Sequence, residues 1–211
     1  MATKIATATA CDHAAAGDTA ALAALSHADL HKPDKHGGLA AHWAAGSGHV
    51  DTLRWLVTHG GFDVESEGRP PSRRAEMQAP RRRPLHYAAR NGQINAVRYL
   101  LEEAHVHPEP RARNGVTPLQ LAVWQNWLDV ARYLVEVHAA DPRQVNDFAC
   151  GAAHWIGTAP PTRAGDGGVQ LLPLARYLLE RGVDWHAPQR QVHDLCFVKT
   201  WLSSTKFPFL M

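Results

Sequence analysis

The chain has 211 residues, of which 45% are hydrophobic, so it can form a folded core and is not disordered by composition. Its 22 Lys and Arg residues against 20 Asp and Glu give a formal net charge of +2, which excludes the strongly basic balance of a general nucleic-acid-binding protein. Three widely spaced cysteines (Cys11, Cys150 and Cys196) without a Cys-x-x-Cys pair argue against a disulfide framework or a zinc ribbon.

No stretch of the sequence has the character of a secretory signal or of a membrane span. Residues 1–10 contain one lysine but no continuous segment of Leu, Ile or Val. No apolar run approaches the roughly 20 residues that a bilayer-crossing helix needs, and no Asn-x-Ser/Thr acceptor is found. We therefore expect a soluble intracellular protein in a reducing compartment, either the cytoplasm or the nucleus.

Two short motifs recur along the chain in step with each other. The first, clearest in the segments 41–45 and 85–89 (AHWAA and LHYAA), begins at residues 41, 85, 119 and 153, at offsets of 44, 34 and 34 residues. The second, clearest in the segment 97–102 (VRYLLE), begins at residues 53, 97, 131 and 175, at offsets of 44, 34 and 44 residues. A recurring spacing of this kind indicates a repeat protein with insertions.

Aligning the copies divides the chain into repeats, loops and a tail. In order, we expect a divergent N-terminal capping repeat at 1–34, repeat 1 at 35–64, an Arg/Pro-rich inserted loop at 65–80, repeat 2 at 81–111, repeat 3 at 112–145, a divergent repeat 4 at 146–188 with an inserted loop at 159–170, and a non-repeat tail at 189–211. The insertions are rich in Pro, Gly and Arg, which is typical of exposed loops. The tail either packs poorly or covers the open end of repeat 4, and the chain is either complete or part of a longer repeat protein.

Each repeat is expected to form two short helices. Pro84 and Pro118 suit the first turn of a helix, where no backbone N–H is missed. In the second motif, apolar residues at i, i+3 and i+4, such as Val97, Leu100 and Leu101, predict one buried face. Helices this short are not stable alone, so stacking of neighbouring repeats has to bury these faces in one continuous core.

The segment Gly115-Val116-Thr117-Pro118-Leu119, followed by a helix that contains alanine, resembles the opening of an ankyrin repeat, and repeat 2 keeps Pro84-Leu85-His86. A basal period of about 33 residues is also that of ankyrin repeats, whereas the Trp and Gly-Tyr landmarks of tetratricopeptide repeats are missing. The resemblance implies an all-α ankyrin-repeat α-solenoid of paired short antiparallel helices with inter-repeat β-turn loops. It also implies a non-catalytic scaffold that binds a protein partner and needs no cofactor, and we expect a monomer.

In ankyrin proteins the partner docks on the concave face, which is formed by the loop tips and the exposed side of the first helix. Trp124 is of particular interest because Trp and Arg are the residues most often found at interface hot spots, although it could instead pack against a neighbouring loop. Trp127 is expected to pack between helices. Carried over position by position, the partner-binding candidates are Lys35, His36, Ser47, Arg82, Arg90, Asn91, Arg113, Asn114, Val116, Trp124, Gln125 and Phe148, together with Gly46, Asp147, Cys150 and Thr158.

Recurring histidines and arginines have structural readings as well as functional ones. His42, His86 and His154 recur once per repeat, roughly 10 Å apart if the helices pack normally, which is too far for one zinc ion. The resemblance implies that they bond the turn backbone instead, and we predict no metal site. A column of arginines precedes aromatic residues on the second helices, and its long stems are expected to cover apolar surface: Arg54, Arg98, Arg132 and Arg176.

Two alternative functions remain open at this point. The Arg-rich loop, with Arg69, Arg73, Arg74, Arg81, Arg82 and Arg83, is either a flexible linker or a contact for nucleic acid, acidic lipid or phosphoprotein. Cys150 lies four residues before His154, so a thiol enzyme is conceivable. It is disfavoured because no third orienting group is placed, and we predict no catalytic residue.

Overall fold

The computed structural model describes residues 8–68, 80–160 and 170–185. The expected tail, most of both inserted loops, and Arg69, Arg73 and Arg74 lie outside the described residues. Within the described ranges the regular structure is helical, with no strand. The elements in order are α1 (Ala10–Ala16), α2 (Thr19–Ala23), α3 (His27–Leu30), α4 (Ala40–Ser47), α5 (Val50–Thr58), α7 (Pro84–Arg90), α8 (Ile94–Arg98) with a π-helical extension Tyr99–Glu103, a 3₁₀ turn Arg113–Gly115, α9 (Pro118–Trp124), α10 (Leu128–Glu136), α11 (Ala152–Gly157) and α13 (Leu172–Glu180).

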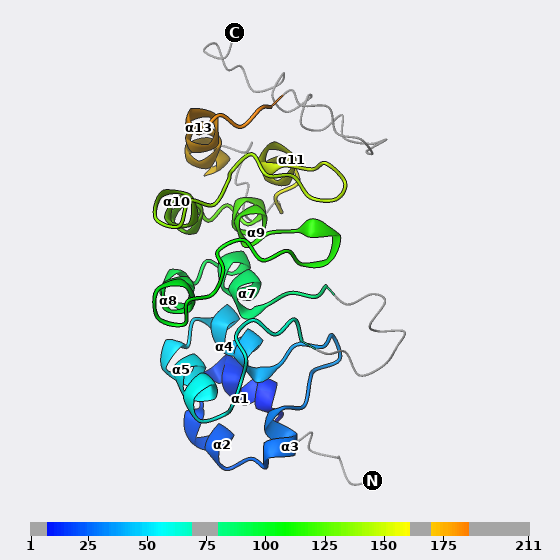
Figure 1. Ribbon diagram of the computed structural model, residues 1–211, viewed down its shortest axis with the longest axis vertical. Coiled ribbons are helices and arrows are strands. Elements are labelled where there is room, and N and C mark those ends of the chain that lie inside the picture. Colours follow the sequence, from blue (N-terminus) through cyan, green and yellow to red (C-terminus); the bar gives the residue numbers. More distant parts are fainter. Residues whose placement is uncertain (1–7, 69–79, 161–169, 186–211) are drawn as a thin grey trace.

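The helices stack in two columns (Figure 1). One column contains the first helix of each unit, α1, α4, α7, α9 and α11, and the other contains the second helices, α2, α5, α8, α10 and α13. The connecting loops extend from the first column on the side away from the second helices. The expected all-α solenoid of paired short helices is therefore confirmed.

The starts of the first helices follow from residues that recur in the sequence. Pro84 and Pro118 occupy the first turns of α7 and α9. Thr117 caps α9, because its hydroxyl accepts from the backbone N–H of Gln120 at 3.3 Å. In α4 and α7 a histidine at the third helical position accepts the backbone N–H of the residue before the helix. The N–H of Leu39 donates to Nδ1 of His42, and that of Arg83 donates to Nδ1 of His86, each at 3.1 Å.

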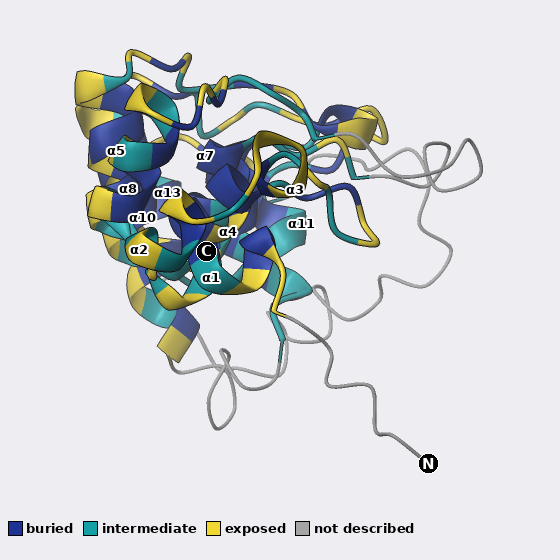
Figure 2. Cartoon of the chain, turned by 90° about the horizontal axis from the view of Figure 1, so that it is seen from below, coloured by how far each residue is buried: buried dark blue, intermediate teal, exposed yellow. Residues whose placement is uncertain are grey.

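The core runs unbroken between the two columns. Small residues on the first helices, such as Ala44 and Ala88, are fully buried and let neighbouring helices approach closely. On the second helices Leu53, Leu100 and Leu134 are also 0% exposed, as the apolar spacing predicted. Seen from below, along the stack, the buried residues face the gap between the columns while the outward sides of α2, α5 and α10 are exposed (Figure 2).

Trp127 links repeats 2 and 3, which confirms that it packs between helices. Its indole Nε1 donates to the carbonyl oxygen of Arg90 at 2.9 Å. The ring lies against Gly92, whose φ of +73° and lack of side chain both suit this close approach. In repeat 1, His49 makes the corresponding bond, from Nε2 to the carbonyl oxygen of Ala15 at 3.0 Å.

The arginine column on the second helices joins successive repeats. Each guanidinium lies over the tyrosine ring of the following repeat, a cation–π contact worth about 0.5–1 kcal/mol at an exposed site. The distances to the ring centroids are 5.0, 5.2 and 5.6 Å in the pairs Arg54–Tyr99, Arg98–Tyr133 and Arg132–Tyr177. These three arginines thus have a structural role, but through their guanidinium groups and not through the stems that the sequence suggested.

Candidate partner-binding site

Four large aromatic residues and one arginine follow one another along the first helices. Trp43 and Tyr87 lie with ring centroids 6.3 Å apart, as do Trp124 and Trp155. Arg90 lies over the Trp124 ring at 5.6 Å, so that it continues the series from α7 to α9. We call these five residues the aromatic row. It extends over four consecutive repeats, and Trp43 at its start is 36% exposed.

The local sequence explains the row. Trp43, Tyr87 and Trp155 each follow the recurrent histidine of their repeat, so they hold the same position on the first helix. Repeat 3 has Leu121 there, which is fully buried, and Trp124 lies three residues later on the same helix. Trp43, Tyr87 and Trp155 were not among the candidates predicted from the sequence. The available signal was the aromatic residue after each histidine.

Trp124 is half-buried rather than fully exposed. Its indole Nε1 donates to the carbonyl oxygen of Thr158 in repeat 4 at 3.0 Å, and its ring meets Trp155 edge to face. Trp124 thus packs against the neighbouring repeat, which is one of the two possibilities that the sequence left open. Contact with a partner remains a prediction, made through the part of the ring that these neighbours leave accessible.

Other candidates lie at the ends of the first helices, beside the row. Ser47 and Gln125 are half-buried. Asn91 is exposed as a residue, but its Nδ2 donates to the carbonyl oxygen of Gly46 at 2.8 Å and thereby ties repeat 2 to repeat 1. Asn91 therefore has a structural function in addition to any contact with a partner.

The loop-tip candidates are more open. Lys35 and His36 are exposed before α4, Arg113 and Asn114 are exposed before α9, and Phe148 before α11 is 46% exposed. An exposed phenylalanine is notable because its apolar ring gains from burial against a partner. By contrast, Val116 is half-buried, and its carbonyl oxygen accepts from His86.

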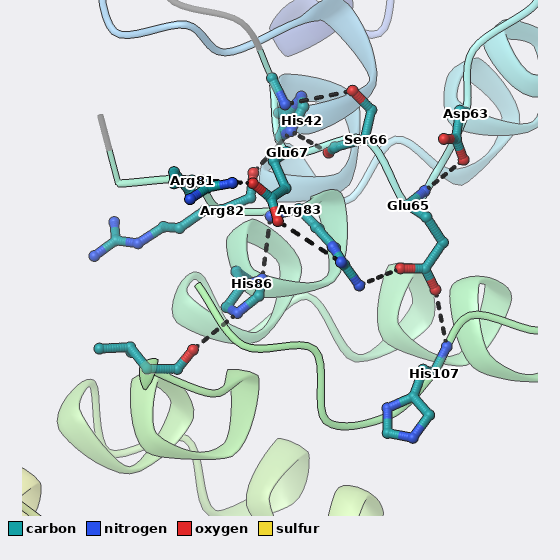
Figure 3. A network of polar contacts seen from close by, with 12 residues as sticks. His42, Asp63, Glu65, Ser66, Glu67, Arg81, Arg82, Arg83, His86 and His107 are labelled. Atoms are coloured by element: carbon teal, nitrogen blue, oxygen red, sulfur yellow. Dashed lines mark hydrogen bonds and ion pairs between the residues drawn. The ribbon is translucent and has the colours of Figure 1, made fainter. Parts of the chain in front are cut away.

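The described end of the Arg-rich loop is partly neutralised within the chain (Figure 3). Arg81 pairs with Glu67 at 2.7 Å, and Arg83 pairs with Glu65 at 2.5 Å and Glu67 at 3.7 Å. Glu65 and Glu67 lie at the start of the inserted loop 65–80 and the two arginines directly follow its end, so these ion pairs connect the beginning of the insertion with the start of repeat 2. The side chain of Arg82 extends away from both carboxylates.

Arg82 has no acidic partner among the described residues. Arg82 is half-buried, and burial lowers the pKa of its guanidinium, with a further lowering by the positive charge of Arg90. Among the described residues neither arginine forms an ion pair, although Arg90 stacks on Trp124. Neither positive charge is therefore neutralised by a described side chain.

Comparison with known proteins identifies the family. A model described as ankyrin repeats (3 copies) matches residues 72–146, and one described as ankyrin repeats (many copies) matches residues 41–101. Together they span residues 41–146, which is 106 of the 211 residues. The chain belongs to the ankyrin-repeat family. Ankyrin repeats are generally protein–protein interaction modules, and the family is typically non-catalytic.

One curated relative is alpha-latrotoxin-Lhe1a of Latrodectus hesperus, with 30% identity over 95 residues. The aligned segment is 45% of this chain but 6% of the length of that protein. The match thus concerns a short part of a much larger molecule. In the described part of the present chain, no helix is both long and apolar enough to cross a membrane.

Two of the three recurrent histidines, His42 and His86, bond to the loop backbone, as the resemblance implied. Nε2 of His42 is 2.9 Å from the carbonyl oxygen of Arg82, and Nε2 of His86 is 3.1 Å from that of Val116. Burial lowers their pKa values to about 4 and about 3, so both rings are neutral at pH 7. Searched over the described residues, no group of three or more His, Cys, Asp or Glu side chains is arranged to hold a metal ion.

The environment of Cys150 does not favour a thiol nucleophile. The residue is buried, and this burial raises the pKa of its thiol, whereas a nucleophilic cysteine requires a lowered one. Its Sγ lies 3.7 Å from the carbonyl oxygen of Phe148. The other described cysteine, Cys11, is buried as well, and burial together with the nearby Asp34 charge raises its pKa to about 12.

Proposed function

We propose that this ankyrin stack is a non-catalytic scaffold that binds a protein partner through its concave face. By concave face we mean the aromatic row together with the adjoining loop tips at residues 34–38, 80–83, 112–116 and 146–150. The observation that carries the proposal is the row itself, since Trp, Tyr and Arg dominate the binding energy of protein interfaces.

The two sides of the stack support this choice of face. On the second helices three arginines are engaged by tyrosines of the next repeat, and Arg54 also pairs with Glu103. On the first helices the rings are partly accessible, and Arg82 and Arg90 lack an acidic partner within the described chain. A partner protein gains more by covering the surface of the first helices, because its rings are partly accessible and its two arginines have no acidic partner among the described residues.

The runner-up function is contact with nucleic acid or another phosphate-bearing partner through the Arg-rich loop. The ion pairs of Arg81 and Arg83 with Glu65 and Glu67 weigh against it, because they reduce the net charge at that end of the loop. This alternative now rests on Arg69, Arg73 and Arg74. We favour the protein-binding proposal.

A matched pair of tryptophans in repeat 1 tests the proposal. Trp43 lies on the first helix and Trp55 on the second, and both are partly exposed. Proteins captured from cell extract by the wild-type chain are compared quantitatively with those captured by Trp43→Ala and by Trp55→Ala. We expect Trp43→Ala to lose specific partners that Trp55→Ala retains, as expected for a hot spot on the concave face.

Trp124→Ala serves as a second variant at the other end of the row. Because Trp124 also bonds to Thr158, its melting temperature has to be measured beside the binding, so that loss of packing is separated from loss of contact. If neither Trp43→Ala nor Trp124→Ala changes the captured proteins while both remain folded, the concave face is not the binding surface.

A further inference from the structure

A pocket of about 390 Å³ lies between α10 and α13, the second helices of repeats 3 and 4. Its apolar surface comes from Leu128 of α10 and from Leu172 and Pro173 in the first turn of α13. Both helices belong to the column opposite the first helices, which carry the aromatic row (Figure 1). The pocket is therefore separate from the concave face.

Three exposed charged side chains also line the pocket, namely Arg132, Arg176 and Glu180, together with the buried ring of Tyr177. Residues four apart on a helix share one side of it, so Arg176 follows Leu172 along the same side of α13. Among the residues that the structure describes, Arg176 forms no ion pair. Its charge is available to a group outside the chain.

The charge of Arg132 is only partly neutralised. Its guanidinium lies over the Tyr177 ring at 5.6 Å, and its Nε is 3.4 Å from Oε1 of Glu136. The same Oε1 is 2.8 Å from the guanidinium of Arg181, so two arginines share one carboxylate. With Arg176 unpaired as well, the positive groups at the pocket outnumber the negative ones.

Repeat 4 differs from the other repeats at one of the residues that line the pocket. The residue after the first apolar position of the second helix is Asp51 in repeat 1, Asn95 in repeat 2 and Asp129 in repeat 3, but Pro173 in repeat 4. The pocket thus has a proline where two other repeats have an acid. It is more apolar and more positive than it would be with aspartate there.

We propose that this pocket binds an acidic segment of a partner protein. Arg176 pairs with the carboxylate of an Asp or Glu side chain of that segment, and Arg132 adds to the positive potential that attracts it. An aliphatic side chain next to this acid packs against Leu128, Leu172 and Pro173. The site is a second binding surface, so the proposal goes beyond the concave face and does not rest on the proposed function.

A protein segment fits this pocket better than a small organic acid. Arg132, Arg176 and Glu180 are exposed, so the pocket is open along the outer sides of two helices. Sites for small molecules bury most of the surface of their ligand, which an open pocket does not achieve. A protein segment can cover the exposed sides of α10 and α13 as well, and thereby gains a larger contact area.

Nucleic acid fits the pocket less well. Binding a phosphate backbone requires positive charge spread along a stripe, so that several phosphates are neutralised at once. Here Glu180 lines the same pocket as the two arginines, and the net charge of the whole chain is only +2. A single carboxylate in a protein segment needs only one free arginine.

Subtractive selection of short random peptides displayed on phage tests the proposal. Peptides that bind the Arg176→Gln variant are removed first, and the remainder are selected on the full wild-type chain. We expect the enriched peptides to carry Asp or Glu next to an aliphatic residue. The strongest peptide is synthesised with a fluorescent label, and its Kd, measured by anisotropy, should rise about tenfold or more in Arg176→Gln.

Three variants that take no part in the selection provide the decisive comparison. Pro173→Asp gives repeat 4 the residue of repeats 1 and 3, and should raise the Kd about three- to tenfold by like-charge repulsion. Glu180→Gln removes a carboxylate from the pocket and should lower the Kd. Arg143→Gln is the matched control, because this exposed arginine lies between repeats 3 and 4 but does not line the pocket, and it should leave the Kd nearly unchanged.

Melting temperatures show whether each variant is folded. The proposal is wrong if no peptide remains after the subtraction, if the enriched peptides lack acids, or if Pro173→Asp and Glu180→Gln leave the Kd unchanged. It is also wrong if a labelled oligodeoxythymidylate binds more tightly than the peptide through Arg176, or if the chain sediments as a dimer that Arg176→Gln separates. The occupant is then nucleic acid or a second copy of the chain. None of these results decides whether a partner binds the concave face, which the Trp43 and Trp124 variants test.

Discussion

Replacing His42 and His86 by glutamine should make the stability of the protein less sensitive to acid. Both rings are buried, at 1% and 0% exposure, and both are neutral at pH 7. In each, Nδ1 accepts a backbone N–H, so the neutral form carries its proton on Nε2 and donates it to a carbonyl oxygen. A second proton would have to go on Nδ1, against that N–H.

The sign and size of the effect follow from the pKa values. Folding lowers the pKa from 6.5 to about 4 for His42 and to about 3 for His86. The main cause is burial, and the Arg82 and Arg83 charges add to it at His86. The unfolded chain therefore binds protons that the folded chain excludes, so stability is full above pH 6.5 and falls as the pH decreases. At pH 5 the loss is about 2 kcal/mol for each histidine, or about 4 kcal/mol for both, from 1.36 kcal/mol per pKa unit.

Repeat 3 shows that glutamine can take over this position. Gln120 occupies it, and its Oε1 accepts from the backbone N–H of Thr117 at 3.2 Å, while its Nε2 donates to the carbonyl oxygen of Gln144 at 3.1 Å. Glutamine does not titrate. The double variant His42→Gln/His86→Gln should therefore keep the same bonds at neutral pH.

Urea unfolding, followed by tryptophan fluorescence at pH 7.5 and pH 5, measures how much unfolding free energy the wild type and the double variant each lose on acidification. The wild type should lose about 4 kcal/mol more unfolding free energy than the double variant between these two conditions. Single variants should each remove about half of the difference. If the wild type and the double variant lose the same amount, the buried neutral histidines do not control the acid sensitivity.

Three further substitutions test the packing of the stack. Leu134→Ala removes a fully buried side chain, and should lower the unfolding free energy in urea by about 2–5 kcal/mol; a loss below about 1 kcal/mol would contradict its place in the core. Gly92→Ala places a side chain at φ +73° against the Trp127 ring, and should cost at least about 1 kcal/mol, visible as a lower melting temperature. Arg98→Gln removes the stack on Tyr133 and should cost about 0.5–1 kcal/mol, with no change if the arginine is only solvated.

The repeat architecture could be predicted because it depends on local patterns that recur. The histidine of the first motif and the leucines of the second each mark a helix face, and stacking identical units makes their neighbours predictable. His86 and Leu100 illustrate this, since both are buried in the contacts that their positions imply. Trp127 was predicted to pack between helices by the same comparison of repeats, and in the structure its indole N–H donates to the carbonyl oxygen of Arg90 in the preceding repeat.

The candidate site was less predictable because it depends on contacts between units that differ. The pairing of Arg83 with Glu65 joins the two ends of an inserted loop, and composition gives no information on how such ends meet. Trp124 appeared exposed when compared with ordinary repeats, but Thr158 and Trp155 of the irregular repeat 4 cover part of it. Insertions break the period on which the prediction relies.

Comparing equivalent positions within the chain separates stabilising residues from candidates for binding. A side chain that makes the same contact between every pair of neighbouring repeats recurs once per unit, as the arginines over tyrosines do at residues 54, 98 and 132. Arg82 and Arg90 lie at positions where no side chain recurs. The residues equivalent to Arg82 are Gly38, Val116 and Cys150, and those equivalent to Arg90 are Gly46, Trp124 and Thr158. Stacking imposes no shared side chain at these two positions, since repeats with glycine there still pack. Arg90 is explained within the stack by its contact with the Trp124 ring of the next repeat, whereas Arg82 has no acidic partner among the described residues and is the better candidate for contact with a partner protein.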